Sequence, residues 1–150
     1  MPELRPLFDF TANVAEPQVA QNGPYGTRRF IPVTGGVFQG ERLRGKILPG
    51  GADCQLIRPD LVAELDVRCT FQTDDGTIFL MKGLGMRHGP ADVLDKIARG
   101  EPVDPNSYYF RESMIFEAPE GPYDWLNKII GIGIGERRVD TVLIKAYELL

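Results

Sequence analysis

Glycine and proline divide the sequence into short segments, since they occur 17 and 12 times in 150 residues. They are spread along the whole chain, so they do not mark a linker between domains. The segments between them are rich in Val, Ile, Phe, Thr and Tyr, which favour β-strands. Many short strands separated by turns are typical of an all-β sandwich or barrel. We therefore expect one antiparallel β-barrel domain over residues 1–150, with eight to ten strands and one or two short helices.

The clearest strand is Ala63–Thr73, in which apolar and polar residues alternate. Leu65 and Val67 lie on the apolar face, whereas Asp66 and Arg68 share the polar face because residues two apart in a strand point the same way. If the polar face meets water, these two charges are simply solvated. If it meets the lumen of a barrel, they must pair or bind something, since burying an unpaired charge is costly. Both orientations are open.

One α-helix is predicted between Pro90 and Gly100. Proline suits the first helical position and glycine the position after the last turn. Val93, Leu94 and Ile97 form an apolar stripe at helical spacing, so this helix is expected to cover one end of the sheet.

Other segments predict loops, bends and close approaches. The polar segment Ala15–Gly26 is expected to be a loop, and so is Gly85–Pro90, which contains His88. Thr34–Gly36 should bend or bulge a strand. In Gly131–Gly135 every second residue is glycine, so one face of that strand is bare and would let another backbone or a ligand approach closely.

The composition excludes several classes of protein. The net charge of −4 argues against a nucleic-acid partner, which needs a clustered positive field. No apolar run approaches the roughly 18 residues of a membrane-spanning helix, and the first ten residues lack the apolar run of a signal peptide. We expect a cytoplasmic protein with no membrane partner, in which Cys54 and Cys69 are reduced and buried.

The sequence also argues against a metal and an organic cofactor. Two cysteines and the single His88 show no paired ligand spacing, so no zinc site is expected. Gly131–Gly135 has Glu136 where a dinucleotide-binding loop needs its third glycine, and no βαβ unit surrounds it.

Two segments combine aromatic and polar residues, Ser107–Glu112 and Tyr123–Asn127. Aromatic side chains around a few polar groups are typical of the wall of a small-molecule pocket. The same composition also suits a barrel core followed by a capping helical turn, and both interpretations stay open.

At these residues the chain resembles DUF3237, also called UPF0311, a largely uncharacterised family of lipocalin-like proteins. The segments that carry the resemblance are Thr34–Gly40, Leu43–Asp53, Ala63–Arg68, Gly100–Pro105, Tyr108–Arg111, Phe116–Glu117 and Trp125–Asn127. The resemblance implies a lipocalin-like antiparallel β-barrel with a central cavity, found as a dimer or larger homo-oligomer. It also implies proton-transfer chemistry, such as hydroxyl addition to an alkene or ring closure on an aromatic compound.

The resemblance supplies the candidate site residues. They are Asp53, Asp66, Arg68, Tyr108, Arg111, Glu117, Trp125 and Asn127. Two positions depart from the family pattern, because Cys54 and Cys69 stand where Trp and Tyr are common. If these positions line the cavity, the pocket is roomier than in relatives.

Our leading hypothesis is an enzyme of the lyase or isomerase type that acts on an apolar or aromatic carbonyl metabolite without a cofactor. Asp66 or Asp53 would be the general acid or base, because burial in a cavity raises the pKa of a carboxyl group. Arg68 or Arg111 would stabilise an oxyanion.

The other candidates would bind the substrate: Tyr108 and Asn127 by hydrogen bonds, Trp125 by covering an apolar ring, and Glu117 as a further contact. On this hypothesis, Asp66→Asn would abolish turnover and leave the fold intact. The alternatives are a carrier that binds an apolar or aromatic molecule without chemistry, and a purely structural oligomeric module.

Overall fold

The computed structural model describes all 150 residues. Its strands are β1 (Leu4–Val14), β2 (Gln18–Gly23), β3 (Gly26–Gln39), β4 (Arg44–Ile47), β5 (Ala52–Ile57), β6 (Ala63–Thr73), β7 (Ile78–His88), β8 (Tyr109–Glu117), β9 (Gly131–Arg137) and β10 (Thr141–Leu149). Its helices are α1 (Ala91–Ala98) and two short 3-10 helices, η1 (Pro105–Ser107) and η2 (Asp124–Lys128).

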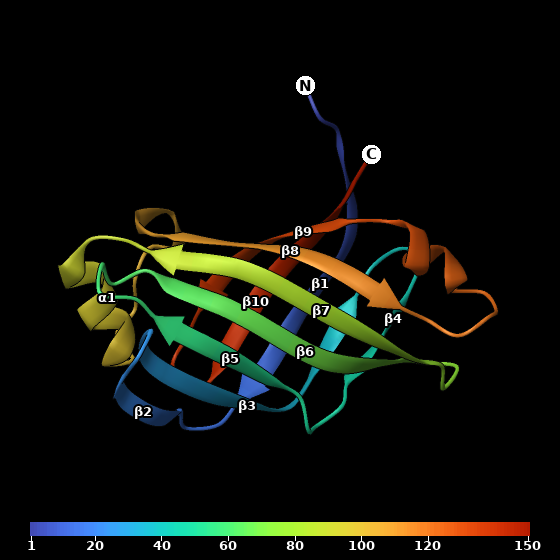
Figure 1. The fold of residues 1–150 in the computed structure, drawn as a ribbon. Helices are drawn as coiled ribbons and strands as arrows, with labels where there is room; N and C mark the ends of the chain where they lie inside the picture. The colour runs from blue at the N-terminus through green and yellow to red at the C-terminus, as the bar shows by residue number, and fades with distance from the viewer.

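The strands form one closed antiparallel barrel (Figure 1). Hydrogen-bonded neighbours run in the order β1-β10-β9-β8-β7-β6-β4-β3, and the pairing of β1 with β3 closes the circle. The ten strands occupy eight positions around the barrel. Strands β4 and β5 share one position, since each pairs with both β3 and β6. Strands β1 and β2 share another, since they pair with opposite halves of β3. Closure leaves no long unpaired edge. The predicted antiparallel barrel is confirmed.

Strand β3 bends at the predicted glycines. Its register with β1 shifts between Asn13 and Val14, opposite Gly35 and Val33. Gly36 has φ +146°, and a Cβ there would lie 2.2 Å from the carbonyl oxygen of Thr11. Only glycine lets the two backbones approach this closely.

Two predicted loops are strands instead. Strand β2 lies within the segment expected to be a loop, because β3 is long enough to pair with it beyond the end of β1. Strand β7 continues to His88, which pairs with Tyr109 of β8 and stacks on its ring at 4.8 Å. The polar or glycine-rich composition of both segments concealed pairing that only the neighbouring strands reveal.

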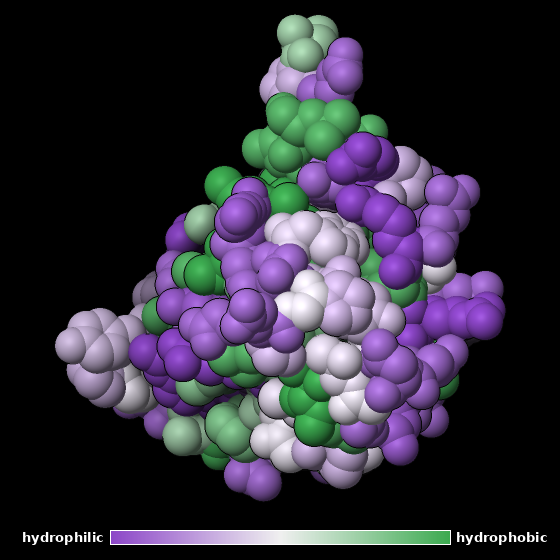
Figure 2. Space-filling view, turned by 90° about the vertical axis from the view of Figure 1, so that its right-hand side faces the viewer, coloured by the Kyte–Doolittle hydropathy of each residue, from purple (hydrophilic) through white to green (hydrophobic).

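One half of the lumen is filled by aromatic side chains. Phe8, Phe38, Phe71, Phe79 and Phe116 contact one another there, with ring centroids 5.1–6.1 Å apart. Helix η2 adds the buried Leu126 to the same core. This end lies on the right in Figure 1 and faces the viewer in Figure 2, where mostly polar and weakly polar side chains cover it. The opposite end, at α1, is not filled in this way.

None of the helices combines the length and the apolar composition that a membrane-spanning helix requires.

Candidate functional site

A large cavity, the outer chamber, opens between α1 and the unfilled end of the barrel. Its volume is about 770 Å³. The predicted helix is present, and Leu94 and Ile97 of its apolar stripe line the chamber together with Ile57, Leu61 and Val139. The helix therefore covers one end of the barrel, as its apolar stripe predicts, and leaves a hollow large enough for a small organic molecule.

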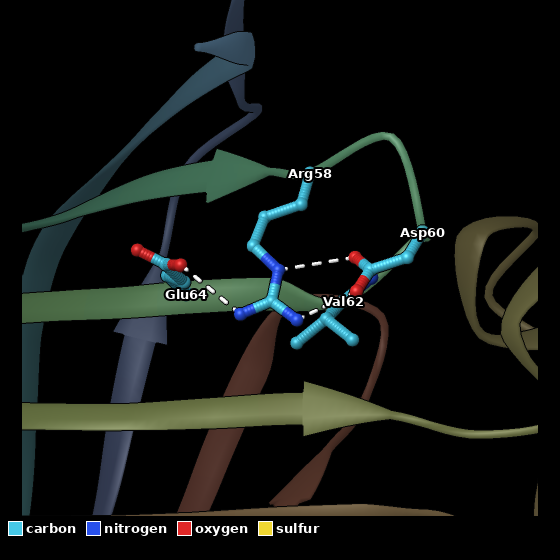
Figure 3. Close-up of polar contacts among 4 residues, drawn as sticks. All are labelled: Arg58, Asp60, Val62 and Glu64. Carbon is cyan, nitrogen blue, oxygen red and sulfur yellow. Dashed lines mark hydrogen bonds and ion pairs between the residues drawn. The ribbon is translucent and has the colours of Figure 1, made fainter.

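A loop between β5 and β6 brings Leu61 to the chamber. Arg58 donates two hydrogen bonds to the Asp60 carboxylate, at 3.0 and 2.6 Å, and one to Glu64 at 3.3 Å (Figure 3). Asp60 also accepts the backbone N–H of Val62 at 3.3 Å. These contacts hold Leu61 at φ +68°, a backbone conformation that is unusual for a bulky residue.

A second, smaller cavity, the inner chamber, lies deeper in the barrel. It measures about 40 Å³ and is lined by the polar side chains Asp53, Gln55 and Glu112 among apolar residues. Arg87 and Arg137 line both chambers, so they stand between them. Polar groups from β5, β7, β8 and β9 thus meet at one level of the lumen.

Glu112 is an acid on the apolar face of its strand. It alternates with Phe110 and Met114, which are buried core residues. A Cβ at Gly83 would lie 3.2 Å from its Oε2, and one at Gly85 would lie 2.8 Å from its Cγ, so the glycines of β7 make room for this side chain. Burial raises the pKa of Glu112 to about 8. Glu112 is therefore mostly protonated at pH 7.

Asp53 is the second interior acid, and it is held by hydrogen bonds. Its Oδ2 accepts from Nε2 of Gln55 at 2.8 Å, and its Oδ1 accepts from the backbone N–H of Asp66 at 3.1 Å. Burial raises the pKa of Asp53, while these two hydrogen bonds and the charge of Arg87 oppose the rise. Asp53 therefore keeps a raised pKa, but unlike Glu112 it has hydrogen bonds that stabilise its ionised form.

Three arginines approach these acids without pairing with them. Arg29, Arg87 and Arg137 line the outer chamber, and none of their side chains donates a hydrogen bond or forms an ion pair. Burial, followed by repulsion from Arg29 and Arg137, lowers the pKa of Arg87 to about 10. Burial also lowers the pKa of Arg29 and of Arg137. The lumen therefore holds a cluster of cations without local partners.

Comparison with known proteins places the chain in a family. Residues 2–149 match the family profile described as "Protein of unknown function (DUF3237)". The chain belongs to the DUF3237 family. A UPF0311 protein from Rhodopseudomonas palustris is 39% identical over 148 residues, which cover 99% of this chain and 97% of the relative. A UPF0311 protein from Bradyrhizobium diazoefficiens is 38% identical over 144 residues, covering 96% and 94%.

Solved structures share the fold of this chain. A conserved protein of unknown function from Rhodopseudomonas palustris superposes with a TM-score of 0.94 at 39% identity, covering 100% of this chain and 98% of that one. A β-barrel-like protein from Acinetobacter baumannii gives 0.87 at 38% identity, covering 100% and 97%. An enzyme from Penicillium herquei gives 0.74 at 16% identity, covering 99% and 95%, and at that identity it shows the fold alone.

Two of the residues expected from the DUF3237 resemblance lie with the interior polar groups. Asp53 lines the inner chamber. Tyr108 is buried, and its hydroxyl oxygen accepts the backbone N–H of Arg137 at 2.9 Å.

The lumen orientation considered for Asp66 and Arg68 is wrong. Leu65, Val67 and Cys69 point inward, so Asp66 and Arg68 point outward and line neither chamber. Arg68 is exposed. The physical reason is that the apolar face of β6 supplies the barrel core, and the alternation then sends both charges to the outer wall.

Arg111 and Glu117 also point outward. They have the opposite parity to the buried Phe110 and Phe116 on β8. Arg111 donates to the carbonyl oxygen of Phe110 at 2.9 Å, and its guanidinium lies 5.3 Å from the ring centroid of Tyr109. These contacts keep Arg111 on the outer wall, away from both chambers.

Helix η2, which contains Trp125 and Asn127, lies at the end of the barrel opposite α1 (Figure 1). The guanidinium of Arg42 lies 4.2 Å from the Trp125 ring centroid. Asn127 accepts the N–H of Ala118 at 2.6 Å and donates to its carbonyl oxygen at 2.9 Å. The segment Tyr123–Asn127 is therefore the capping turn, and it lines neither chamber.

The bare face of β9 points inward, where side chains rather than a ligand occupy it. A Cβ at Gly133 would lie 2.4 Å from Cε of Met114, and one at Gly135 would lie 2.4 Å from the Phe110 ring. The approach predicted here is that of another backbone or a ligand; core side chains take that place instead. Arg137 continues the same inward face at the end of the strand.

The two cysteines differ in environment. Cys69 is buried and lines the inner chamber, and burial raises the pKa of its thiol to about 12. Cys54 is exposed on the outer wall, so the expectation that it is buried is wrong. Its neighbours Asp53 and Gln55 take the inward positions of β5.

Iodoacetamide is expected to modify Cys54 in the folded protein and to leave Cys69 intact. The thiolate is the reactive form, and Cys69 is both enclosed and protonated at pH 8. Peptide mass spectrometry measures the labelling of each site, with a sample in guanidinium chloride as the control that exposes both. Equal labelling of both cysteines in the folded protein would contradict this assignment.

Proposed function

We propose that the outer chamber binds an apolar or aromatic carbonyl compound and that the interior acids catalyse proton transfer on it. One observation carries the proposal: two carboxyl groups, the buried Glu112 and the half-buried Asp53, line the inner chamber behind Arg87 and Arg137, and neither is ion-paired with an arginine. Groups with unusual pKa values in a cavity are typical of catalytic sites. If each acid were held in a bidentate ion pair with an arginine, it could not transfer a proton, and a carrier without catalytic activity would be favoured.

The two carboxyl groups are suited to different roles. The Glu112 side chain makes no hydrogen bond within the protein and mostly holds its proton at neutral pH, so it is the proposed general acid. Asp53 is held toward the ionised form by Gln55 and by a backbone N–H, so it is the proposed base. Two titratable groups with divergent surroundings are a frequent basis for acid–base assignment.

A substrate in the outer chamber would reach the two acids through the space between Arg87 and Arg137. The inner chamber of about 40 Å³ holds roughly two or three water molecules and no organic molecule. The carbonyl end of a substrate in the outer chamber would therefore meet the acids directly or through one water, which is within the reach of general acid–base catalysis. The fungal barrel described as an enzyme supports only the point that this fold can carry catalysis.

Deuterium exchange into 2-tetralone tests the catalytic proposal. This aromatic ketone has acidic protons beside its carbonyl, and NMR in D₂O follows their replacement. We expect the protein to accelerate the exchange and Glu112→Gln to slow it by about 100-fold, the lower range for loss of a general acid or base. Asp66→Asn should retain the full rate because Asp66 lies on the outer wall, which reverses the expectation from the sequence.

A carrier gives a different result in the same experiment. It would bind 2-tetralone, detected by chemical-shift changes of the ligand, without accelerating exchange in any variant. This second candidate is favoured by the separation of the acids from the outer chamber by Arg87 and Arg137. Loss of exchange in Asp66→Asn with retention in Glu112→Gln would contradict both the assignment and its geometry. The homo-oligomer and the cytoplasmic location stay predictions.

A further inference from the structure

The arginine cluster of Arg29, Arg87 and Arg137 lacks a partner in the protein. The three side chains come from β3, β7 and β9 and line the outer chamber. Arg87 is only 8% exposed, yet it forms no ion pair and donates no hydrogen bond from its side chain. Burial of unpaired guanidinium groups is unfavourable. A site that accepts this cost is arranged to receive negative charge from outside the chain.

Interior acids do not neutralise the cluster. Asp53 attracts all three arginines, but its two oxygens already accept hydrogen bonds from Gln55 and from a backbone N–H. Glu112 adds little charge at pH 7, because burial raises its pKa to about 8. Among the interior groups, three arginines therefore face one ionised acid, Asp53.

Unsatisfied polar atoms mark the place where a ligand would bind. Three buried side-chain atoms have no hydrogen-bond partner, and two of them, Nη1 of Arg137 and Oε1 of Gln55, belong to side chains that line the inner chamber; the third, Oδ1 of Asp66, does not. Such atoms are rare in folded proteins and call for a ligand or ordered water. A ligand oxygen can accept from the Arg137 guanidinium, whereas a water molecule can donate to Gln55.

Acidic residues that line the outer chamber limit the charge of the ligand. Glu16, Asp95 and Asp140 line the outer chamber but not the inner one, and none of them forms an ion pair. Asp140 is close enough to Arg137 to act on its pKa. A doubly charged phosphate ester would meet repulsion from these carboxylates, which a single carboxylate bound deeper among the arginines avoids.

We propose that Arg29, Arg87 and Arg137 bind one singly charged organic anion, a carboxylate whose apolar body lies in the outer chamber against Leu61, Leu94 and Ile97. The inference deepens the proposed function, since it names the class of molecule that the chamber takes. Guanidinium groups bind carboxylates through paired, charge-assisted hydrogen bonds. The apolar lining of the chamber matches the hydrocarbon part of such an acid.

Binding of three matched fluorescent probes tests the inference at pH 7. They are 2-naphthoate, the uncharged 2-naphthalenemethanol and 2-naphthyl phosphate. We expect 2-naphthoate to bind at least about tenfold more tightly than the alcohol, since charge-assisted hydrogen bonds contribute at this level. The preference should weaken as sodium chloride is raised, and the phosphate should bind less tightly than the carboxylate.

Variants locate the binding site. Arg137→Gln and Arg29→Gln should each lower the affinity for 2-naphthoate by about tenfold and leave that for the alcohol unchanged. Arg138→Gln is the matched control, because Arg138 neighbours Arg137 but lies outside the chamber and contacts Glu136 at 3.5 Å. Thermal unfolding of each variant shows whether the barrel is intact. Two arginine variants are used so that the test does not depend on the folding of a single one.

Each other outcome overturns the inference in a recognisable way. Equal binding of carboxylate and alcohol removes the anion site but leaves a small-molecule chamber, so the proposed function survives. Tighter binding of the phosphate contradicts the single charge. An unchanged preference in both arginine variants places the anion elsewhere. No binding of any probe at millimolar concentration contradicts both this inference and the binding part of the proposed function, whatever the result of the exchange experiment.

Discussion

Glu112→Gln is expected to raise the free energy of unfolding by roughly 5 kcal/mol at pH 9 and by less than about 1 kcal/mol at pH 5. In the native protein the pKa of Glu112 rises from 4.5 to about 8 because the side chain is buried beside Asp53. Between these values the folded chain keeps a proton that the unfolded chain has released. Folding stability therefore falls as the pH rises through this window, and the neutral amide removes that dependence.

Denaturant unfolding followed by circular dichroism at pH 5, 7 and 9 measures the effect. Glu117→Gln is the matched control, since Glu117 lies on the same strand but points outward and is exposed. It should leave the pH dependence unchanged. Burial also raises the pKa of Asp53, so Asp53 makes folding stability fall with pH in the same direction. This smaller contribution remains in Glu112→Gln. If stability changed with pH in the same way in the native protein and in Glu112→Gln, Glu112 would not have a raised pKa. That result would contradict its assignment as the general acid.

Phe71→Ala is expected to lower the free energy of unfolding by about 3–5 kcal/mol. Phe71 is fully buried at the centre of the aromatic half of the lumen. Its ring stacks on Phe79 at 5.2 Å and on Phe8 at 5.7 Å, and it meets Phe10 and Phe38 edge to face. The barrel wall around it is closed by hydrogen bonds, so it cannot collapse to fill the space that the ring leaves.

Two further variants separate packing from general destabilisation. Phe30→Ala removes an exposed ring from β3 and should cost less than about 1 kcal/mol. Phe71→Leu should fall between the two alanine variants, because it leaves a smaller cavity. Binding of 2-naphthoate to folded Phe71→Ala should be unchanged, since Phe71 lines neither chamber. A loss below 1 kcal/mol for Phe71→Ala would mean that the aromatic cluster is not the main core.

Much of the fold could be predicted because its signals are local. The alternation in Ala63–Thr73 reproduces β6 residue for residue, and the apolar stripe after Pro90 gives α1 within one or two residues of its ends. Strand β2 could not be recognised, because all six of its residues are exposed and only pairing with β3 orders them. A polar strand of this kind carries no periodic apolar signal.

The site could be predicted only in part. Asp53 and Tyr108 lie with the interior polar groups, but Glu112, Arg87 and Arg137 were missed. A signal was present for Glu112, since it shares the parity of Phe110 and Met114 on a strand whose apolar side must face the core. The family resemblance instead selected Arg111 and Glu117, which occupy the outer wall. A charged residue on the apolar face of a strand is the better indicator of a lumen site.

The sequence by itself determined which residues form strands and which of them share a face, because side-chain direction alternates along any strand. Only the tertiary structure decided which face encloses the lumen and which strands meet across it. The interior polar groups come from β3, β5, β7, β8 and β9, between Arg29 and Arg137 in the chain. Closure of the barrel brings them together, and no local pattern encodes contacts between strands so far apart.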